Sequence, residues 1–133
     1  MSSPFAHLFA RLARSSAVHV LFAFLAMGGW AVLANRAHAM PAPLFAGVIQ
    51  GGLSAAITLF LKRVIEALAL HLHGVAALLA PPVITCLVSA SLLTLIHTLS
   101  GTPEVLATIA LPMTVATSYA ALYNVSLWKA GGR

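Results

Sequence analysis

The chain contains four long apolar runs separated by short polar breaks, and this pattern constrains its fold more than any other feature. A helix needs about 20 apolar residues to cross roughly 30 Å of hydrocarbon. Runs of this length cover residues 16–34, 42–61, 75–98 and 105–128. They lack the two-residue alternation of membrane-barrel strands, and helices pair their own backbone groups within lipid. We therefore predict an all-α, polytopic membrane protein with four transmembrane helices arranged as two helical hairpins.

Composition supports this assignment, because the chain is 61% hydrophobic and 7% charged. Soluble domains carry roughly 25% charged residues. The three predicted parts are an N-terminal interfacial segment (1–15), a transmembrane bundle (16–128) and a short C-terminal tail (129–133). In the first part, Phe5, Leu8, Phe9 and Leu12 recur at helical spacing, which predicts a short helix lying in the membrane interface. The alternative for this part is a tail without regular structure.

A cleaved signal peptide is a second alternative for the N-terminal region, since Arg11 and Arg14 precede an apolar run and Ala37-His38-Ala39 resembles a cleavage site. The apolar run is longer than that of a signal peptide, and Arg36 lies just before the cut. Both features favour a first transmembrane helix that is retained.

Basic residues are concentrated at one end of the predicted helices. Lys and Arg near helix ends are retained on the cytoplasmic side of a membrane. Only Arg36 falls on the opposite side, where Glu104 also lies. The other cations are Arg11, Arg14, Lys62, Arg63, Lys129 and Arg133. Both termini are therefore predicted to be cytoplasmic, in an inner membrane. The net charge of +5 then describes a rim that faces lipid head groups, and no nucleic-acid partner is predicted.

Catalytic and metal-binding motifs are not apparent in the sequence. The single cysteine, Cys86, falls inside the third span, and the six histidines are dispersed over different depths. No nucleophile elbow, phosphate-binding loop or dinucleotide fingerprint is present in the sequence. We therefore predict a protein that is not an enzyme and has neither a metal nor a cofactor.

Polar residues at helical spacing mark the second span. Gln50, Ser54, Thr58, Lys62 and Glu66 recur every four residues, and Glu66 is placed to pair with Lys62. Beside this row, small residues at positions 47, 51 and 55 predict close helix packing. Structural hydrogen bonding between helices is one interpretation of Ser54 and Thr58, and a polar path for a ligand is the other.

The third span is predicted to be a central helix, because it is polar on two faces, one at Thr85 and Ser89 and the other at residues 91, 94 and 98. Pro81-Pro82 predicts the N-terminus of this helix, since the first turn tolerates proline. His97 ends the span near the level of Arg36. The two either present donors to a phosphate or sugar, or His97 bonds to a backbone carbonyl.

The final span ends in the sequence Tyr123-Asn124-Val125-Ser126-Leu127-Trp128-Lys129. With the chain length and the four spans, this ending resembles the GtrA family of small membrane proteins, although no arginine follows Asn124. Members of that family are implicated in flipping polyprenyl-phosphate-linked sugars across the inner membrane.

The resemblance implies a small transporter or flippase-like protein that binds or translocates such a lipid. Its predicted substrate-binding residues are Lys62, Arg63, Gln50, Ser54, Thr58, Asn124, Arg36 and His97. The alternative is a non-catalytic accessory or assembly subunit of a larger membrane complex. A proton-coupled drug exporter ranks behind both, because it needs a carboxylate inside the membrane. Expected partners are membrane lipids, an isoprenoid phosphate among them, and either further copies of the chain or other membrane subunits.

Overall fold

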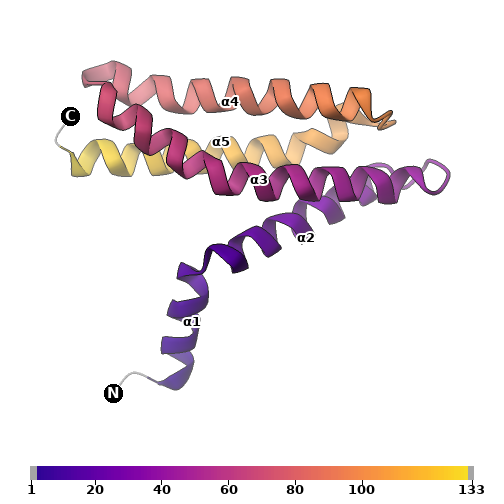
Figure 1. Ribbon diagram of the computed structural model, residues 1–133, viewed down its shortest axis with the longest axis horizontal. Helices are drawn as coiled ribbons and strands as arrows, with labels where there is room; N and C mark the ends of the chain where they lie inside the picture. The colour runs from indigo at the N-terminus through magenta and orange to yellow at the C-terminus, as the bar shows by residue number, and fades with distance from the viewer. Residues whose placement is uncertain (1–2, 132–133) are drawn as a thin grey trace.

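The computed structural model describes residues 3–131, and the regular structure in this range is entirely helical (Figure 1). The helices are α1 (Pro4–Arg14), α2 (Ser16–Ala34), α3 (Ala42–His71), α4 (Gly74–Leu99) and α5 (Val105–Ala130). The last four are each long and apolar enough to cross a membrane. The predicted all-α fold with four membrane-spanning helices is confirmed.

The turns of the chain define two ends of the bundle. The turns at residues 35–41 and 100–104 form one end, here called the hairpin end. The turn between α3 and α4 and the C-terminus of α5 form the other, here called the terminal end. Helices α2 and α3 form one closely packed hairpin, and α4 and α5 form the second.

Helix α3 is longer than the sequence predicted. The polar break expected at Lys62 and Arg63 lies inside the helix, which continues to His71. Residues 62–71 contain neither Gly nor Pro, and Ile65 and Ala69 are buried, so nothing ends the helix where its composition changes. Its 30 residues span about 45 Å, well beyond the hydrocarbon thickness of roughly 30 Å.

Helix α4 begins one residue before the apolar run predicted at 75–98, so the assignment of Pro81-Pro82 to its N-terminus is wrong. The helix starts at Gly74, so both prolines lie in its interior. Neither proline has an N–H to give to the carbonyl four residues earlier, which leaves Ala77 O and Leu78 O without their helical donors. The side chain of Asn124 replaces these donors, as described below.

Three glycines allow α2 and α3 to approach closely. A Cβ atom at Gly28 would lie 2.8 Å from Gly47 O, and a Cβ at Gly51 would lie 2.9 Å from Phe24 O. Both distances are too short for any other residue without a shift of backbone, so the small-residue packing predicted for positions 47 and 51 is confirmed. Away from this contact, most described residues in the N-terminal half of α2 are exposed, with Phe22 at 69%.

Helix α3, rather than α4, has the larger number of neighbours. It packs against α2, α4 and α5, whereas α4 packs against α3 and α5. Figure 1 shows α3, α4 and α5 side by side, with α2 oblique to them and α1 directed away. Leu61, Ile65 and Ala120 form the buried apolar cluster between α3 and α5. The third span therefore touches more than one helix, as predicted, without being the centre of the bundle.

Candidate functional site

A buried polar cluster joins α3 to α4 near the hairpin end. His97 Nε2 lies 2.8 Å from Gln50 Oε1, and His97 Nδ1 lies 2.8 Å from the hydroxyl of Thr102. Gln50 Nε2 donates to Ser54 Oγ at 2.8 Å. Gln50 and His97 are completely buried. The cluster therefore holds α3, α4 and the α4–α5 turn together. Burying any of these polar groups in lipid without a hydrogen-bond partner would cost free energy, so the contacts stabilise this arrangement.

The hydrogen-bond partners in this cluster determine which ring nitrogen of His97 carries a hydrogen. Gln50 Oε1 can only accept, so His97 Nε2 carries a hydrogen and donates it. The Thr102 hydroxyl can either donate to Nδ1 or accept from it. The cluster thus accommodates the imidazole without an unsatisfied atom.

A second polar cluster at the hairpin end joins the two hairpins to each other. Asn35 Nδ2 donates to Ala31 O and to Thr108 Oγ1, both at 2.8 Å, and Asn35 Oδ1 accepts from the backbone N–H of Glu104 at 3.0 Å. The carboxylate of Glu104 contacts His38 Nε2 at 2.9 Å. Asn35 is the C-cap of α2 and is fully buried. In the sequence it falls in the polar break after residues 16–34 and was not predicted as a site residue, although a lone Asn directly after an apolar run was the available signal.

Charged and aromatic side chains meet near the terminal end. Lys62 Nζ lies 3.9 Å from Glu66 Oε1, so the ion pair predicted from their spacing is present. The Tyr123 hydroxyl donates to the same carboxylate, and the Tyr119 and Tyr123 rings stack with centroids 5.6 Å apart. Arg63 is exposed and makes no ion pair with any residue that the structure describes. An exposed cation at this level is free to meet an anion from outside the chain.

Asn124 compensates for the two interior prolines of α4. Its Nδ2 donates to Ala77 O at 3.0 Å and to Leu78 O at 2.7 Å, the two carbonyls that Pro81 and Pro82 leave unpaired. Asn124 is 1% exposed. Nearby, Trp128 Nε1 lies 3.3 Å from Gly74 O. Side chains of α5 thus hold the first turns of α4, and the Asn124 amide hydrogens are used within the chain.

The predicted site residues do not form one continuous path. Gln50, Ser54 and His97 come together near the hairpin end, whereas Lys62 and Arg63 lie toward the terminal end. Thr58 is half-buried between these levels, and Asn124 is bonded to α4. Arg36 is exposed and donates to Leu33 O at 2.9 Å, separate from the His97 cluster. Contrary to the interpretation in which His97 faces a head group, its ring is fully buried.

The space between α3, α4 and α5 is closed at mid-height. The internal gap there does not admit a water-sized sphere. It is lined by Leu61, Thr85, Cys86, Ser89, Ala116 and Thr117. Among the described residues, every buried side-chain nitrogen or oxygen has a hydrogen-bond partner. A single copy of the chain therefore offers no polar channel along this gap.

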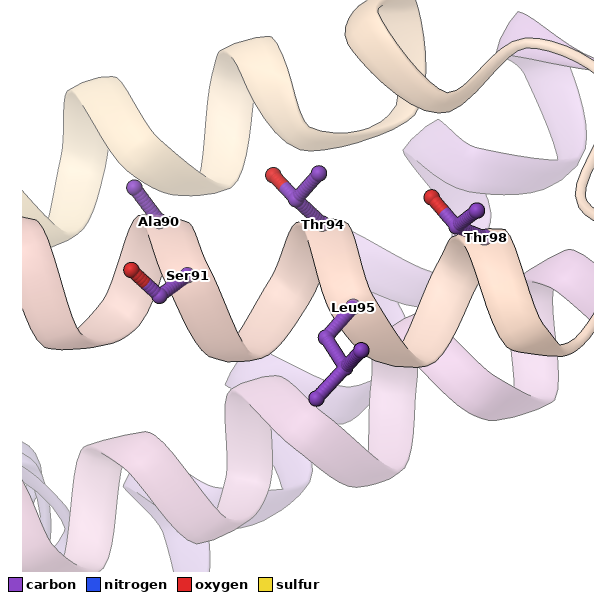
Figure 2. A pocket seen from close by; sticks show the side chains of 5 residues that line it. All are labelled: Ala90, Ser91, Thr94, Leu95 and Thr98. Atoms are coloured by element: carbon purple, nitrogen blue, oxygen red, sulfur yellow. The ribbon is translucent and has the colours of Figure 1, made fainter.

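One of the two polar faces of α4 points away from the bundle. Thr85 and Ser89 are buried as predicted, but Ser91, Thr94 and Thr98 are exposed. Figure 2 shows these hydroxyls with Ala90 and Leu95 along a shallow, open depression on α4. The expectation that both polar faces contact neighbouring helices is wrong for one copy of the chain.

These features define a multi-pass α-helical membrane protein with a closed interior and polar clusters at two levels. Comparison of the chain with family models, curated proteins and solved structures gives no match. The resemblance to the GtrA family therefore stays a prediction.

Proposed function

We propose that this protein is a non-catalytic subunit of a membrane assembly, in which its helices pack against further transmembrane helices. The observation that carries this proposal is the contrast between a closed interior and an outward-facing hydroxyl face on α4. Hydroxyl groups in lipid gain free energy by bonding across helix interfaces, about 0.6 kcal/mol each on average. The exposed N-terminal half of α2 offers further surface for such packing.

Site-directed cross-linking tests the subunit proposal. In a Cys86→Ala background, Thr94→Cys places a thiol on the exposed face of α4, and Val115→Cys places one on an exposed position of α5. Both variants are treated in membranes with a bifunctional thiol or thiol–amine reagent. A discrete cross-linked species at position 94 that is absent at position 115 supports the proposal. Exclusively uncross-linked chain at both positions, with both thiols reactive, contradicts it.

A second proposal follows from the basic residues of α3. We propose that Lys62 and Arg63 bind the phosphate of a lipid, in line with the polyprenyl-phosphate flippase function that the GtrA resemblance implies. Lys62 is 58% exposed and Arg63 is exposed. Twenty residues of helix precede Lys62, which places it about 30 Å along α3, where hydrocarbon gives way to head groups. Since the interior of one copy is closed, translocation would use the outer surface of α3 or a space between copies.

Mass spectrometry of co-purified lipid tests the second proposal. The protein extracted with native lipid is compared with the double variant Lys62→Ala and Arg63→Ala and with the control Lys129→Ala. A polyprenyl phosphate retained by the parent and the control, but lost from the double variant, supports lipid binding. Equal retention by all three proteins, or none by the parent, contradicts it.

A further inference from the structure

Helix α1 is an independent helix rather than an extension of α2. Ser15 has extended backbone (ψ 119°), and its hydroxyl accepts from Val18 N at 3.4 Å, which caps the start of α2. At the other end, the Ser3 hydroxyl accepts from Ala6 N at 3.3 Å and caps the start of α1. Both helices therefore have defined ends, and the chain changes direction between them (Figure 1).

Two large apolar side chains of α1 are not covered by the rest of the molecule. Phe5 is 82% exposed and Leu8 is 55% exposed. Among the described helices, α1 packs against α2 alone. Isolated helices shorter than about 12 residues are marginal in water, and α1 has 11 residues. Its helical form thus needs an apolar surface outside the chain.

The direction and the charge of α1 indicate what that surface is. Figure 1 shows α1 running across the direction of α3, α4 and α5, so it lies near the membrane plane when those helices cross the bilayer. Arg11 is exposed and lies one helical turn beyond Leu8, at the flank of the apolar face. A long basic side chain in that position reaches lipid phosphates while its stem stays against acyl chains. The first carboxylate of the chain is Glu66, so no acidic side chain within residues 1–65 opposes an anionic surface.

We propose that α1 docks onto an anionic bilayer surface, with Phe5 and Leu8 at the boundary of the acyl chains and Arg11 among the phosphates. Helix α2 ends in the turn at residues 35–41, so its start and α1 lie away from the hairpin end, and α1 docks on the leaflet that also meets Lys62, Arg63 and Lys129. The proposal depends on the membrane-spanning character of α2–α5. It depends on neither the subunit function nor the binding of a polyprenyl phosphate.

Spin-label depth measurements test this docking on the full-length chain. In a Cys86→Ala background, Leu8→Cys labels the apolar face of α1 and Ala10→Cys labels the opposite face. The two proteins are reconstituted into phosphatidylcholine vesicles with and without phosphatidylglycerol. We expect the label at position 8 to be severalfold more accessible to oxygen than to a water-soluble nickel complex, and the label at position 10 to show the reverse. Arg11→Gln should reduce the difference, and so should omission of phosphatidylglycerol.

Two results would overturn the proposal. Equal access of the nickel complex to both labels, in both kinds of vesicle, would place α1 in water. Dipolar broadening at position 8 that is lost on dilution with unlabelled protein would show that a second copy covers the apolar face instead. Helical content measured by circular dichroism confirms that each labelled chain is folded.

Discussion

Gln50 and His97 show how single side chains secure a helix contact in lipid. Because each is completely buried and bonded to the other, truncating one leaves the other without its partner. We expect Gln50→Leu or His97→Leu to lower the free energy of unfolding by about 1–3 kcal/mol. The double variant should lose less than the sum of the two single losses, because neither Gln50 nor His97 is then left buried without the other. Unfolding in mixed micelles measures all three values, and strictly additive losses would contradict the contact.

Asn35 marks the limit of residue-level reasoning from the sequence. Gln50 was singled out because its large polar side chain lies inside an apolar run, and the structure confirms that it is buried. Asn35 and Thr102 lie in turns, where polar residues are ordinary, so neither stood out. Their partners are set by which turns meet at the hairpin end, which no local pattern encodes.

At the scale of the helix, the Asn124 amide on α5 replaces the two backbone donors that Pro81 and Pro82 remove from α4. Asn124→Leu should therefore lower the free energy of unfolding by about 1–3 kcal/mol. When Pro81 and Pro82 are both replaced by Ala, the helix supplies its own donors, and the same Asn124→Leu change should cost much less. Chemical unfolding of the four proteins gives this comparison.

Ser126→Ala is the matched control for this cycle, since among the described residues the Ser126 hydroxyl bonds within its own helix, to Tyr123 O. We expect a change within about 0.5 kcal/mol. An equal cost of Asn124→Leu in both proline backgrounds would show that Asn124 does not act through the two carbonyls.

The glycine contact between α2 and α3 provides its own internal control. A methyl group at Gly51 would meet Phe24 O at 2.9 Å, whereas one at the adjacent Gly52 would meet nothing within 4 Å. Gly51→Ala should destabilise the α2–α3 hairpin by about 1–3 kcal/mol through overpacking. Gly52→Ala should be neutral or slightly stabilising, because alanine favours the helix. Thermal unfolding of the two variants in the same detergent checks this contrast, and similar effects of both would contradict the close approach.

Helix boundaries illustrate what could be predicted at the scale of elements. The starts of α2, α3 and α5 coincide with the starts of the apolar runs. Helix α4 starts one residue before its run, whereas α3 continues to His71 although its run ends at residue 61, because hydropathy reports where lipid ends and not where hydrogen bonding ends. Pro81 and Pro82 were interpreted as a helix start, because prolines inside a helix leave carbonyls without donors. The donor that pairs with these carbonyls, Asn124, lies about 40 residues away in sequence, on α5, and the local sequence does not reveal it.

At the scale of the whole molecule, the orientation in the membrane is a prediction from charge. With six cations toward one side and Arg36 on the other, the hairpin end should face outward and both termini should be cytoplasmic. In a Cys86→Ala background, Ala37→Cys should react with an impermeant thiol reagent added to intact cells. His73→Cys should react only after the membrane is permeabilised. The opposite labelling pattern would invert the predicted topology.

The lengths of the apolar runs were sufficient to predict a four-helix membrane fold, because the physical requirement for crossing lipid is nearly independent of sequence detail. The candidate site was less predictable. Rows of polar residues at helical spacing do not distinguish a bonded interface from a path for a ligand, and Ser91, Thr94 and Thr98 show that such a row can also face outward.

The close contact of α2 with α3 has a mechanical consequence for the N-terminal region. The backbones of α2 and α3 meet at the glycines between Phe24 and Val32, whereas most described residues before Phe24 in α2 are exposed. Ser16 lies eight residues before Phe24, or about 12 Å along the helix. A change of about 10° in the crossing angle would swing the start of α2 by about 2 Å, and α1 with it. A small change of side chain at the glycine contact would therefore displace α1 along the membrane surface.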